Sequence, residues 1–200
     1  MMAIKFQIGG HYLAVKRGLD VLMSLAGLLV FLLPSALIAL AIACTSPGPV
    51  LFWSERVGQG NRMFKMPKFR TMRVGAPLVE TDLLGQPDTW ITPLGRLLRR
   101  SSLDEVPQLW SVLKGDMSLV GPRPALPSQG DLVRLRTLAN IHLLRPGLTG
   151  LAQVSGRDNL SSHQKVTYDQ AYFEGISLFL DCKLLLLTVD RVFRGQGVKH

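Results

Sequence analysis

One stretch of the chain, from Val21 to Cys44, contains no charged residue. At 1.5 Å per residue, these roughly 24 residues would form a helix of about 36 Å, which is long enough to span a bilayer. Pro34 lies near the middle of the stretch, where a proline removes one hydrogen bond and bends a helix. The sequence therefore predicts a membrane helix that is broken at Pro34.

Basic residues flank this stretch on both sides. Lys16 and Arg17 precede it, and six more follow it: Arg56, Arg62, Lys65, Lys68, Arg70 and Arg73. Because basic residues mark the cytoplasmic side, a helix that enters and leaves by the same leaflet would satisfy both flanks. A tilted anchor with a proline kink is the alternative, whereas a cleaved signal peptide has a shorter apolar region.

Composition narrows the class of partner. A net charge of +9 on 200 residues favours an acidic partner, which could be nucleic acid, anionic lipid or a phosphorylated substrate. Cys44 and Cys182 lie far apart, and the four histidines show no ligand spacing, so neither a disulfide framework nor a zinc site is expected. We expect a basic leader and membrane helix over 1–45 and one domain over 46–200.

Residues 99–124 combine a helix start, a short amphipathic helix and a turn. Ser102 and Glu105 have the spacing of a capping box, but Pro107 is tolerated only in a first turn and favours Leu103 or Asp104 as the cap. Gly115 is a natural end for this helix. With either cap, Asp104 and Glu105 lie in the first turn.

A carboxylate in a first turn lies at the positive end of the helix dipole. That position favours the ionised form, which a nucleophile or a metal ligand needs. Arg99, Arg100 and Arg123 add positive charge on both flanks. A capped surface helix with incidental arginines has the same local pattern, so these features alone do not decide between the two interpretations.

The remaining segments give a helix-rich pattern with little strand. Residues 50–53 predict a short strand or an interfacial aromatic patch, and the basic run 56–73 could lie on lipid headgroups, grip a phosphate or face solvent. Helices are expected over 128–144 and 162–174, and 176–193 favours an amphipathic helix on the membrane or in the core.

Several nucleotide and hydrolase motifs are absent from the sequence. There is no Gly-x-x-x-x-Gly-Lys loop, no Gly-x-Gly-x-x-Gly after a strand, no Asp-x-Asp pair and no serine elbow. The remaining residues suit phosphoryl chemistry, with an oxygen nucleophile, a carboxylate for Mg²⁺ and cations for phosphates. One adjacent Asp-Glu pair is enough, because Mg²⁺ typically uses one or two protein carboxylates and the substrate's phosphates.

Four blocks of sequence then identify a family. Residues 68–72 (Lys-Phe-Arg-Thr-Met), 102–109, 113–124 and 145–157 together resemble the bacterial sugar transferases, the monotopic phosphoglycosyl transferases, in family order. The resemblance runs from about Lys16 to Gly197. We expect an α-rich α+β fold, with a re-entrant membrane helix broken at Pro34, amphipathic interfacial helices and a small cytosolic catalytic domain with few short strands.

The resemblance implies an activity. Such enzymes move a sugar-1-phosphate from a nucleotide sugar, usually a UDP-sugar, to undecaprenyl phosphate through a covalent phosphosugar on an aspartate. Residue by residue, it implies Asp104 as the nucleophile and Glu105 as its catalytic partner and Mg²⁺ ligand. Lys68 and Arg99 match basic active-site residues, and Arg123 would contact the nucleotide or its phosphates. Three more arginines match only as general substrate-binding residues: Arg70, Arg145 and Arg157.

The sequence also departs from the family pattern. Leu33 precedes Pro34 where some members have serine, and Leu151 and Ser155 replace a tryptophan and an asparagine. These changes bear on the helix break and on local contacts, but not on the reaction.

The expected setting is the cytoplasmic face of the bacterial inner (plasma) membrane, where the family begins glycan assembly. The expected partners are a nucleotide sugar, undecaprenyl phosphate and an anionic membrane surface, with no nucleic acid, and self-association as a homo-oligomer is left open. A non-catalytic membrane-surface protein is the second class, and a nucleic-acid binder would leave residues 21–44 unexplained.

Overall fold

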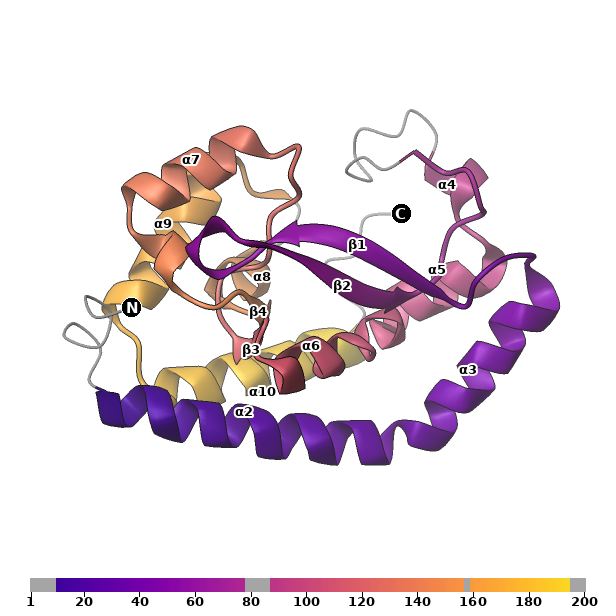
Figure 1. Cartoon of the computed structure of the whole chain (residues 1–200), viewed down its shortest axis with the longest axis horizontal. Helices are drawn as coiled ribbons and strands as arrows, with labels where there is room; N and C mark the ends of the chain where they lie inside the picture. Colours follow the sequence, from indigo (N-terminus) through magenta and orange to yellow (C-terminus); the bar gives the residue numbers. More distant parts are fainter. Residues whose placement is uncertain (1–9, 78–86, 157–158, 195–200) are drawn as a thin grey trace.

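A computed structural model describes residues 10–77, 87–156 and 159–194 (Figure 1). Short strands form two pairs, an antiparallel hairpin of β1 (Leu51–Val57) with β2 (Met63–Phe69) and a parallel pair of β3 (Ser118–Val120) with β4 (Gly147–Thr149). The α-helices of the described residues are α2 (Gly10–Val30), α3 (Leu32–Thr45), α4 (Pro87–Trp90), α5 (Pro93–Ser101), α6 (Gln108–Lys114), α7 (Gly130–Leu138), α8 (Leu151–Ser155), α9 (Ser162–Glu174) and α10 (Leu178–Arg194). The expectation of a helix-rich fold with few short strands is confirmed.

The uncharged stretch forms two helices, α2 and α3, that meet at an angle of 58°. The break lies at Phe31, so Pro34 is not the break itself but part of the first turn of α3. The cause is still the proline, because its ring clashes with the carbonyl of the residue four positions earlier, which is Val30, the last residue of α2. Neither helix alone has the length and hydropathy of a membrane span, whereas the bent pair together does.

One side of α2 packs against the rest of the protein through polar contacts. The Asp20 carboxylate is buried and accepts a hydrogen bond of 3.0 Å from the backbone N–H of Leu119 in β3. The Arg17 guanidinium donates to the carbonyls of Val112 and Leu113, at 2.6 and 2.8 Å, in the last turn of α6. A cation at that end of a helix satisfies carbonyls that have no partner inside the helix. These contacts hold α2 beneath α6.

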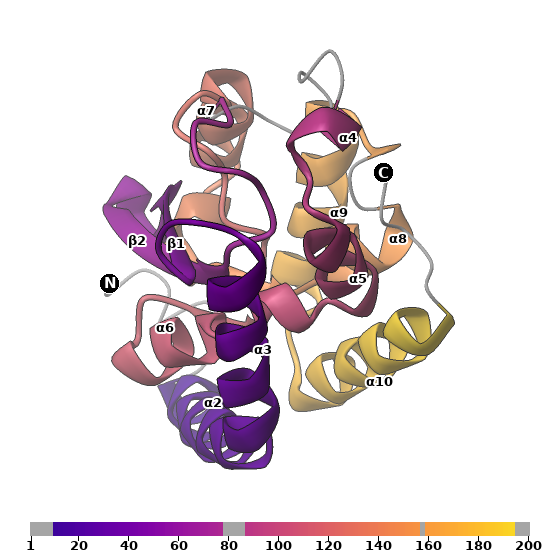
Figure 2. The ribbon, with the colours of Figure 1, turned by 90° about the vertical axis from the view of Figure 1, so that its right-hand side faces the viewer.

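The C-terminal helix α10 is joined to the same end of α2. The buried Asp181 carboxylate accepts hydrogen bonds from the Tyr12 hydroxyl, the Lys16 ammonium and the Tyr172 hydroxyl, at 2.7, 2.8 and 2.7 Å. Figure 2 shows α2 and α10 at the base of the molecule, with α6 above α2. Leu184 of α10 is buried in the main core. The base is therefore a layer of helices that is closely tied to the domain above it.

The predicted helices differ from the observed ones mainly at their ends. The helix expected over 162–174 has the bounds of α9, which starts with a capping box between Ser161 and Gln164. The helix expected over 128–144 is shorter, because α7 ends at Leu138 and a separate 3₁₀ turn covers Ile141–Leu143. The stretch expected over 176–193 forms α10.

Candidate functional site

The two neighbouring carboxylates lie in a short 3₁₀ turn that precedes α6, and not in the first turn of the α-helix itself. α5 ends at Ser101, and the next residue, Ser102, has a left-handed φ of 57°. Leu103–Glu105 then form a 3₁₀ turn before α6 begins at Gln108. The Ser102 side chain makes no capping hydrogen bond, so the predicted capping box is wrong. Pro107 explains the difference, because its ring is incompatible with the α-helical position of the Leu103 carbonyl four residues earlier.

Glu105 joins three segments of the chain. Its Oε1 atom accepts from the Lys68 Nζ atom of β2 at 3.0 Å and from the Arg123 Nη2 atom, in the turn after β3, at 3.1 Å. The side chains of Lys68 and Glu105 are each 16% exposed. A carboxylate held by two cations in partly buried surroundings is strongly oriented.

Asp104 is the most buried of these acidic groups, with only 7% of its surface exposed. Burial raises the pKa of Asp104 to about 6, against the Lys68 charge, which lowers it. The Glu105 carboxylate raises the pKa further, and Arg99 and Arg123 lower it. Asp104 is therefore ionised at neutral pH while being poorly solvated, and a carboxylate in this state can act as a nucleophile.

Arg99 reaches this cluster from the last turn of α5. Its Nε atom donates to the Thr71 hydroxyl at 2.9 Å. The start of the same helix lies directly on the backbone of Thr71, because the backbone N–H of Thr92 donates to the Thr71 carbonyl at 3.0 Å. A Cβ on Gly95 would lie only 2.0 Å from that carbonyl oxygen, so this close approach requires glycine. Because α5 lies on the backbone just after β2, Arg99 of α5 and Lys68 of β2 are held close to each other.

The structure assigns other contacts to two of the predicted substrate-binding arginines. The buried Arg70 guanidinium donates to the carbonyls of Ser46 and Pro47, at 2.6 and 2.8 Å, and so ties the loop after α3 to the end of β2. Arg145 lies near Arg17 and Asp20, where burial and the Arg17 charge lower its pKa and the Asp20 carboxylate raises it. Arg157 lies outside the described residues.

Sequence reasoning did not anticipate the residues that support Arg123. Arg56 of β1 donates to the Pro124 carbonyl at 3.3 Å, and Arg136 of α7 donates to the Arg123 carbonyl at 2.7 Å. The only sequence signal for Arg56 was its place in a basic run, which is usually a solvated face. Arg136 lay in an ordinary helical pattern and gave no signal.

Asp104 and Glu105 could hold a metal only if water or substrate oxygens completed its coordination shell. In the described part of the chain, no three His, Cys, Asp or Glu side chains form a group that could bind a metal. Asp104 and Glu105 offer two carboxylates beside three cations. This donor set fits Mg²⁺, which commonly takes one or two protein carboxylates and completes its shell with water and substrate phosphates.

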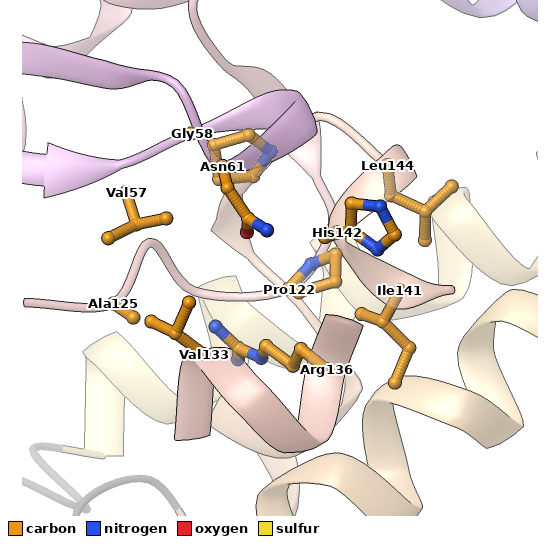
Figure 3. A pocket seen from close by; sticks show the side chains of 11 residues that line it. Val57, Gly58, Asn61, Pro122, Ala125, Val133, Arg136, Ile141, His142 and Leu144 are labelled. Atoms are coloured by element: carbon orange, nitrogen blue, oxygen red, sulfur yellow. The ribbon is translucent and has the colours of Figure 1, made fainter. Parts of the chain in front are cut away.

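A cavity lies beside the turn that carries Arg123. Figure 3 shows that its lining includes Pro122 and Ala125 from that turn and Arg136 from α7, with His142 opposite. Most of the remaining lining is apolar, and neither Asp104 nor Glu105 contributes to it. The carboxylate cluster and this cavity are therefore separate features that share one supporting turn.

Comparison with known proteins adds a family to this geometry. The model of a family described as bacterial sugar transferase matches residues 11–195. A UDP-N-acetylgalactosamine-undecaprenyl-phosphate N-acetylgalactosaminephosphotransferase of Aeromonas hydrophila is 34% identical over 94% of this chain and 46% of its own length. A UDP-glucose:undecaprenyl-phosphate glucose-1-phosphate transferase of Caulobacter vibrioides is 41% identical over 87% of this chain and 68% of its own.

A third relative and this chain match over nearly the full length of both. The exopolysaccharide production protein ExoY of Rhizobium meliloti is 35% identical over 95% of this chain and 89% of its own length. In contrast, the chain spans about half the length of several other curated relatives that it matches.

Proposed function

Because the chain belongs to the bacterial sugar transferase family, we propose that it transfers a sugar-1-phosphate from a UDP-sugar to undecaprenyl phosphate. Relatives from Aeromonas hydrophila, Klebsiella pneumoniae and Caulobacter vibrioides carry names that describe this type of transfer. The observation that carries the proposal is the buried Asp104 carboxylate, placed among Lys68, Arg99 and Arg123.

In the first step, an oxygen of ionised Asp104 attacks the phosphorus atom that bears the sugar. A new P–O bond to Asp104 forms, the P–O bond to the uridine monophosphate breaks, and UMP leaves with that electron pair. The product is a covalent aspartyl-phosphosugar. Burial supports this role because a carboxylate with little hydration is a better nucleophile than a solvated one.

In the second step, a phosphate oxygen of undecaprenyl phosphate attacks the same phosphorus. The P–O bond to Asp104 breaks, so the carboxylate is regenerated and the lipid carries a diphosphate-linked sugar. Both steps develop negative charge on phosphate oxygens. Lys68, Arg99 and Arg123 can stabilise that charge without reorganising, because they already surround the carboxylates.

We propose Mg²⁺ as the metal, with Glu105 as its protein ligand. When bound, Mg²⁺ would neutralise charge on the diphosphate and polarise its P–O bonds. Glu105 suits this role because Lys68 and Arg123 already orient its carboxylate. Asp104 is then left for attack on phosphorus. Chelation with EDTA should abolish UMP release, and added Mg²⁺ should restore it.

We further propose that α2 and α3 enter and leave the membrane from the cytoplasmic side. The bend of 58° and the basic residues on both flanks support a re-entrant arrangement. The two helices at the base of the molecule carry exposed apolar side chains, among them Leu22 and Leu29 of α2 and Phe179 and Leu186 of α10, and these support contact with lipid.

Labelling of single cysteines tests this topology. After Cys44 and Cys182 are replaced by serine, cysteines at Gly10 and Ser46 should both react with an impermeant reagent from the cytoplasmic side in inverted vesicles. Labelling of the two positions from opposite sides would show that the bent helix pair crosses the membrane. Pro34→Leu should straighten the pair and change the labelling of one position.

The decisive activity experiment measures UMP release from a panel of UDP-sugars with undecaprenyl phosphate and Mg²⁺. Wild-type protein should release UMP from at least one donor, and the panel is needed because the relatives' names differ in the sugar. Asp104→Asn should abolish release and should trap no phosphosugar on the protein. Full activity of Asp104→Asn would exclude Asp104 as the nucleophile.

A further inference from the structure

The turn that presents Arg123 is held at every one of its carbonyl groups. We call residues 122–125 the arginine turn. The carbonyls of Pro122 and Ala125 accept from the backbone N–H groups of Gly147 and Val57, at 2.8 and 2.9 Å. The carbonyls of Arg123 and Pro124 instead accept from the arginine side chains described above. Four donors from three separate segments, β1, α7 and β4, therefore converge on four consecutive residues.

The arginine turn has little internal freedom of its own. Pro122 and Pro124 have fixed φ angles, and each proline also restricts the residue before it. The turn therefore moves largely as one unit, and whatever holds its carbonyls also sets the position of the Arg123 Cα atom. From this backbone, the Arg123 guanidinium reaches Glu105 at 3.1 Å.

Arg136 is itself oriented by a buried carboxylate. Its Nε and Nη2 atoms donate to the same oxygen of Asp169 in α9, at 2.9 and 2.6 Å, which leaves Nη1 to donate to the Arg123 carbonyl. Only 8% of Arg136 and 1% of Asp169 are exposed. Figure 3 shows the Arg136 side chain extending from α7 below Pro122, in the cavity lining that it shares with Pro122 and Ala125.

Stability alone explains this buried pair poorly. Removing two charges from water is costly, and buried ion pairs can often be replaced by apolar residues without loss of stability. The pair does, however, give one guanidinium a defined direction, with two of its donors on Asp169 and a third on the arginine turn. An apolar pair of the same volume could not supply that third hydrogen bond.

We infer that Arg136, oriented by Asp169, is a positioning residue that holds Arg123 against Glu105 for the transfer of the sugar phosphate. This inference rests on the proposed function, because it assigns Arg136 a role in that reaction. The chain of contacts runs from Asp169 to Arg136, to the Arg123 backbone, and from the Arg123 side chain to Glu105. Arg136 therefore acts through Arg123 and not on the substrate.

A double-mutant cycle on UMP release tests this role. Arg136→Lys keeps a charge near Asp169 but cannot reach both Asp169 oxygen and the Arg123 carbonyl in the same fork geometry. It should lower kcat/KM by about 10- to 100-fold, which is the effect of a small misplacement of a catalytic group. In an Arg123→Ala background, the same substitution should lower kcat/KM by less than about twofold, because its target is already gone.

Matched variants separate positioning from a general loss of structure. Arg134→Lys, on the exposed side of the same helix, should leave kcat/KM unchanged. Asp169→Asn should resemble Arg136→Lys and should add little to it. If the effects of Arg136→Lys and Arg123→Ala instead multiply, Arg136 acts independently of Arg123 and the inference is overturned.

Hydrogen exchange gives a readout that does not depend on activity. Peptides that contain Val57 or residues 121–126 should exchange faster in Arg136→Lys than in wild type, while peptides from α2 and α6 should not change. Unchanged exchange in the arginine turn would overturn the inference even if activity fell. If wild-type protein released no UMP, the proposed function would fail, and the exchange data would still show whether Arg136 holds the turn.

Discussion

At the scale of single residues, Asp104 shows how one environment produces two opposing effects. Burial disfavours its charge, whereas Lys68, Arg99 and Arg123 favour it, and the outcome is a carboxyl group with a pKa of about 6. Asp104 is therefore ionised at neutral pH but retains the reactivity of a poorly hydrated anion. Glu105 beside it is neutralised by two direct ion pairs, which suits a ligand or orienting group more than a nucleophile.

The first prediction concerns the pH dependence of activity. Because attack needs ionised Asp104, kcat/KM for UMP release should rise about tenfold per pH unit below pH 6 and level off above it. Glu105→Gln removes a charge that raises the pKa of Asp104, so its residual activity should level off at lower pH. A profile that stays flat through pH 6, or a shift of the Glu105→Gln profile to higher pH, would contradict this assignment.

The second prediction concerns stability at the same residue. The pKa of Asp104 is raised from 3.8 to about 6 in the folded protein, so its protonated form is favoured by folding. Its stabilising contribution is complete below pH 3.8 and is lost as the pH rises through 6, where an ionised buried group remains. Asp104→Asn should therefore be more stable than wild type above pH 6, by about 1–3 kcal/mol.

Thermal unfolding of detergent-solubilised protein in metal-free buffer measures this difference. Each kcal/mol should raise Tm by about 2–4 °C in a chain of this size. Asp131→Asn, an exposed residue in the first turn of α7, is the control and should lower Tm slightly. Equal Tm values for wild type and Asp104→Asn at neutral pH would show that burying the ionised Asp104 carboxylate does not destabilise the protein.

At the scale of elements, the site depends on backbone segments that touch without side chains between them. α5 lies on the backbone of Thr71 at Gly95, and Gly121, just after β3, closely approaches Gly147 at the start of β4 and Gly150 just after β4. A Cβ on Gly147 would lie 2.1 Å from the Gly121 nitrogen. These approaches bring the arginine turn, β2 and α5 close enough for their side chains to share one cluster.

The third prediction tests one of these contacts. Gly95→Ala should destabilise the protein by about 1–3 kcal/mol, because the methyl group would overlap the Thr71 carbonyl and push α5 away. UMP release should also fall, since Arg99 donates to Thr71. Gly130→Ala in α7 has open space around the new methyl group and should stabilise the protein by about 0.4–1 kcal/mol. Thermal unfolding of the two variants should therefore give Tm changes of opposite sign.

At the scale of the whole molecule, the bent apolar helices are part of the folded domain. Four side chains of α2 make the contacts to the domain: Arg17 binds α6, Asp20 binds β3, and Tyr12 and Lys16 bind Asp181 of α10. The contacts connect residues up to 169 positions apart. The cluster around Asp104 and Glu105 is therefore held at a fixed distance from α2. If α2 lies in the membrane surface as proposed, that distance determines where the site meets its lipid substrate.

The fourth prediction compares the two sides of α2. Asp20→Ala should lower stability by about 1–3 kcal/mol, because the buried backbone N–H of Leu119 would lose its acceptor. Leu22→Ala removes a side chain that is 66% exposed and should change stability by less than about 0.5 kcal/mol in detergent micelles. Equal losses in Tm would show that the polar contacts of α2 do not hold it to the domain.

The sequence was informative wherever a local pattern decides the structure. The uncharged stretch with its proline, the end of α6 at Gly115, the bounds of α9 and the scarcity of strands all follow from the spacing of neighbouring residues. Motif resemblance likewise selected Lys68, Glu105 and Arg123, which the structure brings into direct contact. Local spacing was less reliable at Asp104 and Glu105, where Pro107 replaced the first turn of a helix by a 3₁₀ turn.

Tertiary structure decided how distant residues are paired. The motifs predicted a substrate-binding role for both Arg70 and Arg123, with a more specific one for Arg123. They gave no sign that Arg70 binds two loop carbonyls or that Arg123 binds Glu105. The sequence also gave no sign that Arg136 and Asp169, 33 residues apart, would support the arginine turn. Periodicity and capping depend on residues within a few positions, whereas ion-pair partners, burial and the raised pKa of Asp104 arise only when separate segments pack together.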